Sequence, residues 1–194
     1  MKPDDQDWPA ASDADFLSSA AGQFIAGAHT YLVAAKTLRY SQEFESRPSI
    51  LVRPILHLVA HGCELLLKFP LLWRGTTEQE IQSEFGHDLR RLWTTPANEP
   101  LVAMIRADAS KAWAKASEDG KLSVAEATGD PLEELERALI RLTELHGRHT
   151  RFGLRYGLPP TAIGPRPAYL IDALSPSAER LAKNPLLLDR QLSD

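Results

Sequence analysis

The sequence predicts an all-α fold with four principal helices and several short ones. Two observations carry this prediction. Apolar residues recur at steps of three and four along four long segments, which is the spacing of one helix face. No stretch of useful length alternates apolar and polar residues as a half-buried strand would, and no internal repeat occurs.

Length and composition indicate one ordinary folded domain with a segment at each end. The chain has 194 residues, of which 43% are hydrophobic and 25% charged, enough to build a buried core. The formal net charge of −4 argues against a surface that coats nucleic acid generally, although it leaves a local basic patch open. The single cysteine, Cys63, excludes a disulfide framework, and its apolar neighbours predict a small buried hydrophobe.

The first predicted helix follows an acidic lead. Residues 1–11 carry three aspartates and two prolines, lack the basic and apolar regions of a signal peptide, and are expected to be disordered. Ser12 and Asp15 then form a capping-box pattern, S-D-A-D. From there one apolar stripe predicts a helix of about 25 residues.

The second predicted helix, roughly 50–73, is apolar on nearly every face. Pro54 lies close enough to its start to be tolerated, and the helix ends by Gly75. A helix that is apolar nearly all round is expected to be central. Charged and histidine side chains interrupt its apolar run, so we expect no membrane span and a cytoplasmic protein.

Shorter and later elements follow. In chain order they are a polar connection at 76–84, a short helix at 87–93, a long helix at 100–116 and a loop at 118–129. Asp130-Pro131-Leu132-Glu133 is a strong helix start, and one leucine face continues from it to His146. The remainder, 157–194, reads as a proline-rich extension with one short helix at 176–183.

A single polar seam runs along the second helix. On a wheel of 100° per residue its members fall within about 80° of one another. They are Arg53, His57, His61, Glu64 and Lys68. Because buried ionisable groups need partners, the seam is expected to face solvent, a cleft or partners on another helix.

Two interpretations of the seam are open. His57 and His61, four residues apart, could hold a metal ion with Glu64 as a third ligand. The alternative is a hydrogen-bonded seam in which Glu64 and Lys68 form an ion pair. The zinc motif H-E-x-x-H needs glutamate directly after its first histidine, where this chain has Leu58. We therefore expect a structural seam, with no metal and no cofactor.

Gly86-His87-Asp88-Leu89 opens the predicted short helix. In the structural interpretation, which we favour, it is a capping turn that docks onto the second helix, with Asp88 accepting from free N–H groups. In the functional interpretation His87 is catalytic or binds phosphate. A histidine near a helix N-terminus has its neutral form favoured and can donate to a carboxylate.

The one basic concentration of the chain lies around the end of the last long helix. Its members are Arg141, His146, Arg148, His149, Arg151, Arg155 and Tyr156, opposed only by Glu144. Arginine forks bind oxyanions and aromatic rings stack on bases, so the stretch suits a phosphate group or an RNA backbone. The alternative is a solvated helix end whose cations face the C-terminal dipole and pair with acids of the first helices.

Two sequence blocks together resemble a known family. H-G-C-E-L-L-L-K at 61–68 and G-H-D-L at 86–89 are similar to the signature of HEPN-like (higher eukaryotes and prokaryotes nucleotide-binding) helical domains. Leu154-Arg155-Tyr156 is similar to an Arg-Tyr element that follows the last long helix in such proteins. The resemblance covers residues 15–156. For a domain at 12–156 it implies an up-and-down bundle of four to five helices that forms a homodimer.

The resemblance implies two kinds of function. Better-known members are metal-independent ribonucleases of toxin–antitoxin, phage-defence or RNA-processing systems, whose R-x(4–6)-H motifs meet across a dimer. Other members lack the motif and are non-catalytic binding modules. Arg141 and His146 match R-x4-H, which would make Arg141 the stabiliser of phosphate charge and His146 the general acid or base. Leu142, however, stands where a polar residue is usual.

We therefore expect a HEPN-like module of a bacterial stress or defence system that binds RNA, a nucleotide or a partner such as an antitoxin. A metal-independent endoribonuclease and a purely structural interaction protein are the alternatives. The family comparison also recasts Glu64 and His87 as a hydrogen-bonded pair that fixes the short helix to the second helix. We predict that the side chains of Glu64 and His87 approach to about 3.2 Å or less.

Overall fold

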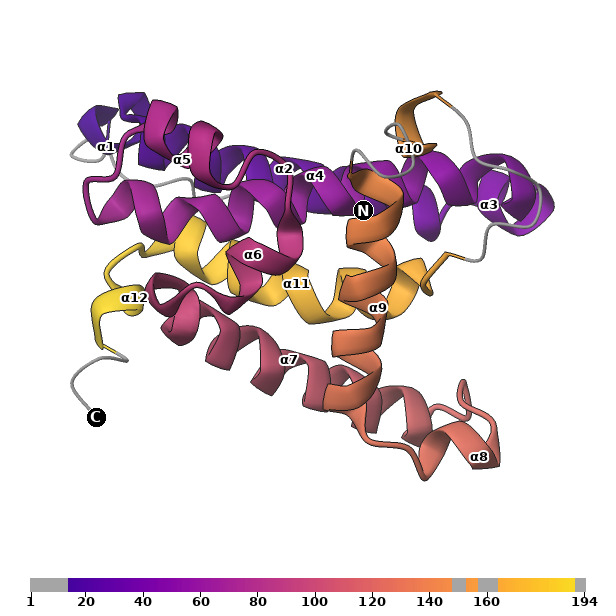
Figure 1. The fold of residues 1–194 in the computed structure, drawn as a ribbon. Coiled ribbons are helices and arrows are strands. Elements are labelled where there is room, and N and C mark those ends of the chain that lie inside the picture. The colour runs from indigo at the N-terminus through magenta and orange to yellow at the C-terminus, as the bar shows by residue number, and fades with distance from the viewer. Residues whose placement is uncertain (1–13, 148–152, 157–163, 191–194) are drawn as a thin grey trace.

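Helices form the whole framework of the computed structural model, as Figure 1 shows. The structure describes residues 14–147, 153–156 and 164–190, and no strand occurs within these ranges, so the all-α prediction is confirmed. The longer helices are α2 (Ala20–Arg39), α4 (Pro48–Trp73), α7 (Glu99–Glu118), α9 (Pro131–His146) and α11 (Pro167–Lys183). The shorter ones are α1 (Ala14–Ser18), α3 (Gln42–Ser46), α5 (Glu78–Glu84), α6 (Leu89–Thr94), a 3₁₀ turn η2 (Pro96–Asn98), α8 (Val124–Ala127), α10 (Gly153–Tyr156) and α12 (Leu187–Arg190).

The helix predicted to be central is α4, which contacts α2, α6, α9, α10 and α11. Helix α2 lies along it in the opposite direction (Figure 1). Two glycines let the pair approach closely. A Cβ atom at Gly62 would lie 2.9 Å from Cγ of Leu32, and one at Gly27 would lie 3.0 Å from Cδ1 of Leu65. The glycine of the 61–68 block therefore serves the packing of α4 on α2.

Helix α4 is also long and apolar enough to cross a membrane by length and composition alone. Half of its most apolar window is buried inside the bundle. The core helix of a folded bundle passes the same test, because burial against other helices also selects apolar side chains.

The predicted first helix is interrupted at Ser19, which corrects the expectation of one continuous helix. The Ser19 hydroxyl accepts a hydrogen bond from the backbone N–H of Gly22 at 3.1 Å and so caps α2. Helix α1 folds back so closely that a Cβ atom at Gly22 would collide with the carbonyl oxygen of Phe16. The capping box predicted at Ser12 lies outside the described residues.

Two short helices, α5 and α8, occupy segments predicted as polar connection and loop. Both begin with a capping box, formed by Thr77 with Glu80 and by Ser123 with Glu126. In each box the hydroxyl accepts from the backbone N–H of the glutamate, whose carboxylate accepts from the backbone N–H of the cap. The caps stabilise short helices whose composition is otherwise typical of loops.

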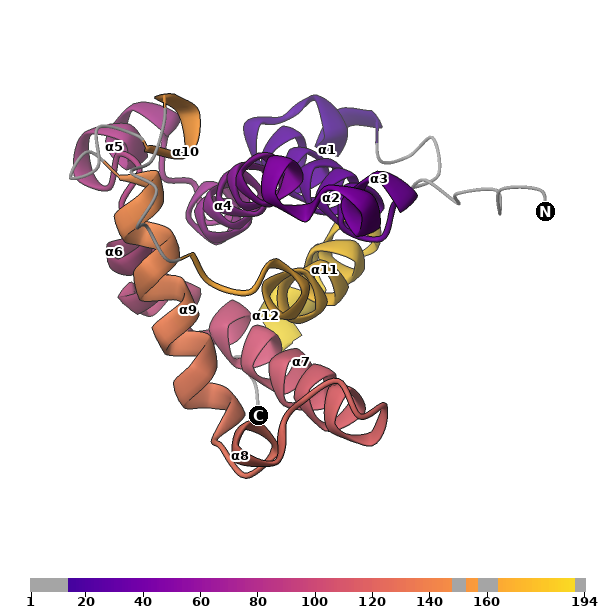
Figure 2. The ribbon, with the colours of Figure 1, turned by 90° about the vertical axis from the view of Figure 1, so that its right-hand side faces the viewer.

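The largest departure from the sequence prediction is α11, which begins at Pro167 instead of near residue 176. It lies between the α2–α4 pair and α7, as the rotated view in Figure 2 shows. One face of it has no exposed surface at all and consists of Leu170, Ile171, Leu174, Ala178 and Leu181. The proline-rich C-terminal part of the chain therefore supplies part of the central core.

Cys63 on α4 is fully buried, which confirms the prediction of a small core hydrophobe. Burial raises the pKa of its thiol to about 12, and the neighbouring charge of Glu64 adds to the effect. Because the thiolate is the reactive form, we expect iodoacetamide to leave the native protein unmodified and to label it after denaturation. Mass spectrometry of protein treated in buffer and in denaturant measures this; rapid labelling of the native chain would contradict it.

Candidate functional site

The polar seam converges on one buried carboxylate, that of Glu64 in the middle of α4, which is 3% exposed. Nζ of Lys68 lies 2.6 Å from Oε1 of Glu64. Nδ1 of His87 lies 3.0 Å from each carboxylate oxygen, and Nε2 of His146 lies 2.8 Å from Oε2. The predicted Glu64–Lys68 ion pair and Glu64–His87 hydrogen bond are both confirmed. We call Glu64, Lys68, His87 and His146 the Glu64 cluster.

Hydrogen bonds and charge keep Glu64 ionised although it is buried. Burial by itself raises the pKa of this carboxyl, because it removes water from the charged form. The hydrogen bond from His146, the charge and hydrogen bond of Lys68 and the hydrogen bond from His87 outweigh burial and hold the pKa far below its usual range. The Lys68 side chain is 6% exposed, so the pair places two opposite charges in the core that balance each other.

The G-H-D-L block positions His87 against Glu64. Gly86 has φ of +54°, a left-handed conformation that glycine adopts easily, and its N–H bonds to the carbonyl of Gln82 at the end of α5. The Asp88 side chain accepts from the backbone N–H of Arg91 at 3.1 Å and caps α6, as predicted. His87 thus lies between the end of α5 and the start of α6, and 28% of its side chain is exposed.

Helix α9 delivers His146 to the cluster. It starts as predicted, with Asp130 accepting from the backbone N–H of Leu132 at 2.8 Å and Pro131 in the first turn. Its leucine face packs on the core and is continued by His146, which is 1% exposed. The other ring nitrogen of His146, Nδ1, has no hydrogen-bond partner within the described residues. The imidazole therefore acts chiefly as a donor to Glu64.

Four of the six histidines of the chain gather along the seam. The ring centroid of His57 lies 6.3 Å from that of His146 and 6.5 Å from that of His61. The rings of His87 and His146 are 5.8 Å apart, and Tyr31 of α2 meets His61 edge-on at 4.4 Å. The seam therefore faces α9 through His57 and Glu64, the turn before α6 through Glu64, and α2 through His61, so this part of it meets partners on other elements.

No family model, curated protein or solved structure matches this chain. In the 61–68 and 86–89 blocks, Gly62 and Leu89 serve packing, and Gly86 and Asp88 serve helix ends. Glu64, Lys68 and His87 belong to the cluster. The two blocks encode how the turn before α6 is joined to α4.

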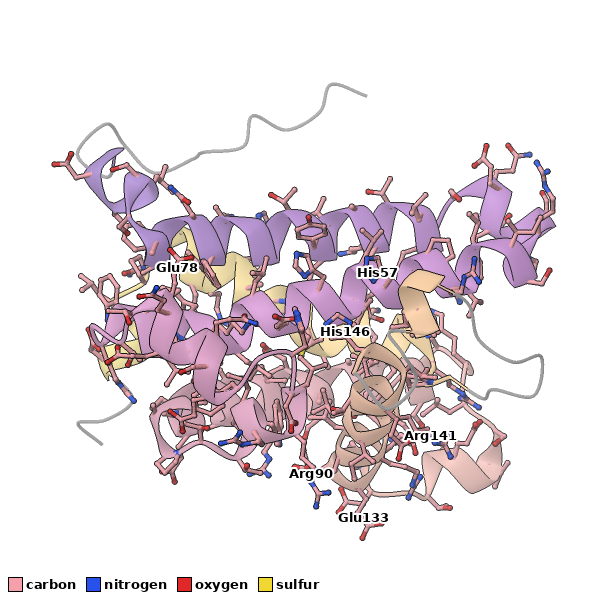
Figure 3. The ribbon with its side chains drawn as sticks, turned by 45° about the horizontal axis from the view of Figure 1, so that its top comes forward. His57, Glu78, Arg90, Glu133, Arg141 and His146 are labelled. Atoms are coloured by element: carbon pink, nitrogen blue, oxygen red, sulfur yellow. The ribbon has the colours of Figure 1, made fainter. Side chains whose placement is uncertain are left out.

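The R-x4-H pair does not converge within one chain. Arg141 is exposed on α9, whereas His146 points into the core (Figure 3). Residues five apart on an α-helix lie about 140° apart around its axis, so the divergence follows from the spacing itself. The seam member Arg53 is also exposed, near the start of α4 and outside the Glu64 cluster.

The remaining predicted ligand-binding residues lie beyond the end of α9 in the chain. Arg148, His149 and Arg151 lie outside the described residues. Arg155 and Tyr156 belong to α10, whose backbone lies against α4 and α9. The basic stretch thus begins directly beyond the helix end that delivers His146 to the cluster.

A second buried polar group, centred on Asp108 of α7, was missed in the sequence. The Asp108 carboxylate, on a residue 5% exposed, accepts from the Ser177 hydroxyl at 2.6 Å and from both terminal nitrogens of Arg180 at 2.7 and 3.1 Å. Its partners come from α11, within the part at 176–183 that is predicted to be helical, but nothing in the sequence pairs that part with α7. Their spacing of three along a helix was the only available signal.

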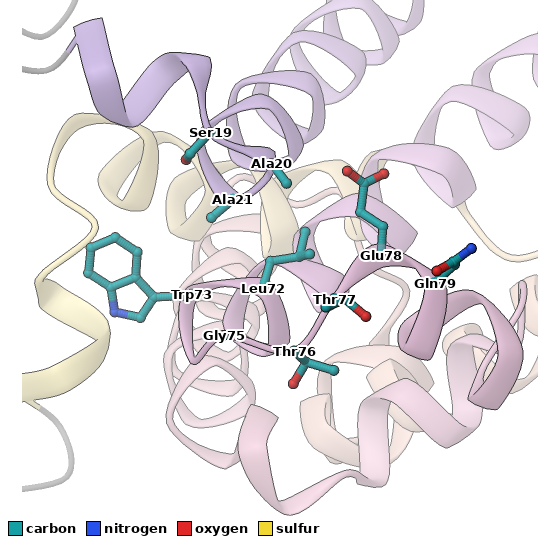
Figure 4. A pocket seen from close by; sticks show the side chains of 10 residues that line it. All are labelled: Ser19, Ala20, Ala21, Leu72, Trp73, Gly75, Thr76, Thr77, Glu78 and Gln79. Atoms are coloured by element: carbon teal, nitrogen blue, oxygen red, sulfur yellow. The ribbon is translucent and has the colours of Figure 1, made fainter.

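One hollow of the described surface lies apart from the cluster. It has a volume of about 660 Å³ and opens where α4 ends, beside the starts of α2 and α5 (Figure 4). Its lining is Ser19, Ala20, Ala21, Leu72, Trp73, Gly75, Thr76, Thr77, Glu78 and Gln79. None of these residues belongs to the Glu64 cluster, so the hollow and the buried polar group are separate features.

Proposed function

We propose that this chain is a HEPN-like module that binds RNA or a nucleotide without cleaving it. The observation that carries the proposal is the position of His146, which is 1% exposed and donates to a buried carboxylate. A general acid or base must come within hydrogen-bond reach of the proton that it transfers. Cleavage by an R-x4-H site would require His146 to leave both Glu64 and the core.

One exposed arginine and the basic sequence that follows it support the binding part of the proposal. Arg141 is exposed on α9 and forms no ion pair within the described residues, and the chain continues with further arginines just beyond this helix. Arginine forks bind phosphate oxygens in pairs. In a chain of net charge −4, such a local concentration is where a polyanion would bind. The 61–68 and 86–89 blocks support the family, and with it a homodimer and a protein partner such as an antitoxin.

Salt-dependent binding of single-stranded RNA tests the proposal. We expect the wild-type chain to bind more weakly as salt rises, with a slope of log K against log salt near −0.7 per phosphate contact. In a variant carrying Arg148→Gln, Arg151→Gln and Arg155→Gln, the magnitude of this slope should fall by up to about 2. The charge-matched control Lys111→Gln, Lys115→Gln and Lys121→Gln removes three exposed cations from the second half of α7 and the segment that follows it, and should leave the slope unchanged. Fluorescence anisotropy measures RNA binding by the wild type and by both variants.

Incubation of RNA with the protein in EDTA separates binding from cleavage. We expect the RNA to stay intact. Metal-independent cleavage that Arg141→Ala abolishes would overturn the non-catalytic proposal and establish the endoribonuclease, because replacing this exposed side chain leaves the core untouched. A chain that binds neither RNA nor any member of a nucleotide panel would be a structural interaction protein instead.

A further inference from the structure

One group of metal-ligating atoms within the described residues lies together in space. The carboxylate of Glu64 and ring nitrogens of His87 and His146 are all within 4.8 Å of one another. Three separate elements bring them there: α4, the turn before α6 and the end of α9. We propose that these three side chains bind a divalent transition-metal ion of the zinc class. This inference does not depend on RNA binding.

The spacing of the ligand atoms fits a four-coordinate ion. Bonds of about 2.0–2.1 Å place tetrahedral ligand atoms about 3.3 Å apart. Nδ1 of His87 lies 3.0 Å from each Glu64 oxygen, and Nε2 of His146 lies 2.8 Å from Oε2. Opening the cluster by roughly a few tenths of an ångström admits the ion and leaves the fourth position for water. Of the three ligands, His87 is the one that reaches the surface, with 28% of its side chain exposed.

The donor set selects the class of ion. Two imidazoles and one carboxylate are ligands of zinc and other first-row transition metals that keep an open position. Magnesium and calcium prefer oxygen ligands throughout. Both histidines ligate in the neutral form, so the proton that each now donates to Glu64 moves to the opposite ring nitrogen. Metal binding therefore replaces two hydrogen bonds by two metal–nitrogen bonds without changing the charge of the ligands.

Lys68 limits the strength of the site without blocking it. Its ammonium bonds to Oε1 of Glu64, which leaves Oε2, the oxygen that accepts from His146, for the ion. The charges of Glu64 and Lys68 cancel, so the incoming ion is not attracted by a net negative site. We therefore expect one ion per chain at moderate affinity.

Titration of the full-length protein with Co²⁺, followed by Zn²⁺, tests the site directly. A cobalt ion with two imidazoles and a carboxylate in four-coordinate geometry absorbs visible light much more strongly than a hydrated surface ion does. We expect visible bands that saturate at one Co²⁺ per chain and disappear when Zn²⁺ is added. Zn²⁺ should also raise the melting temperature, because a ligand that binds only the native state stabilises it.

Two histidine variants locate the ion. His87→Gln removes a partly exposed ligand, and circular dichroism confirms that it folds. It should weaken Zn²⁺ binding by at least about 100-fold, since loss of a mere outer-shell partner already costs about 10- to 100-fold. The matched control His29→Gln replaces a partly buried histidine of α2 outside the cluster and should bind as the wild type does. Absence of visible cobalt bands in the wild type, or equal binding by His87→Gln, would overturn the proposal.

Discussion

Replacing Glu64 with glutamine is expected to destabilise the metal-free protein by about 3–5 kcal/mol, because it leaves a buried ammonium group without a counter-charge. The side chain of Lys68 is 6% exposed, so water cannot take over the role of the carboxylate. His87 and His146 would also exchange an ionised acceptor for a weaker neutral one. Urea unfolding followed by circular dichroism measures the change as a lower midpoint at unchanged slope.

The chain offers a matched control in Glu179 and Lys183 of α11. This pair has the same residue types and the same spacing of four, with a distance of 2.9 Å against 2.6 Å, but both of its side chains are more than half exposed. Glu179→Gln should therefore change the free energy of unfolding by no more than about 0.5 kcal/mol. Equal effects of Glu64→Gln and Glu179→Gln would show that burial does not determine how much a Glu–Lys pair contributes to the free energy of unfolding.

A second variant separates charge from packing. Adding Lys68→Met to Glu64→Gln removes the unpaired ammonium and replaces it with an apolar side chain of similar length. Part of the lost stability should return, because an apolar replacement for a buried ion pair is often neutral or stabilising. A double variant as unstable as Glu64→Gln alone would mean that the hydrogen bonds of the two histidines carry the effect instead.

How much of the Glu64 cluster the sequence predicts depends on how each partner is related to Glu64 along the chain. Lys68 lies one helical turn away, so periodicity alone pairs the two. His87 follows only from the resemblance of two sequence blocks. His146 is 82 positions away, and although the leucine face of α9 turns it inward, no local rule names the residue that it meets. The sequence therefore predicts a polar seam on a central helix but leaves open whether it faces solvent, a cleft or another helix, and it does not name α9 as the partner.

The fold shows the same division between local signals and tertiary ones. The regions of α4, α7 and α9 were predicted, because long apolar stripes and helix-start residues such as Asp130 and Pro131 agree there. The break at Ser19 and the helix starts at Thr77 and Ser123 depend on short capping signals, which the composition of the surrounding segments obscures. Helix α11 carries Pro176 in its interior, where proline normally opposes a helix, and its burial against α7, α2 and α4 outweighs that tendency.

Ending the chain after Arg166, and so removing α11, is expected to abolish cooperative folding. Leu170, Ile171, Leu174 and Leu181 have no exposed surface, and full burial of such a side chain contributes about 1.5–3 kcal/mol. Their sum is comparable to the whole stability of a typical domain, about 5–15 kcal/mol. The truncation also removes both side-chain partners of the buried Asp108 carboxylate. Thermal unfolding of the 1–166 fragment, followed by circular dichroism, should show no sharp transition.

Two leucine substitutions distinguish loss of the buried face from loss of chain length. Leu174→Ala opens a cavity in the core and should cost about 2–5 kcal/mol, whereas Leu186→Ala, at a residue 53% exposed beyond the helix, should change stability by no more than about 0.5 kcal/mol. A 1–166 fragment that melts cooperatively at the full-length temperature would mean that α11 is an appendage, as its proline content suggests. Failure of the fragment together with a large Leu174→Ala effect would instead mean that the core is completed only when α11 docks against α2, α4 and α7. The Glu64 cluster on α4 would then depend on residues more than a hundred positions away.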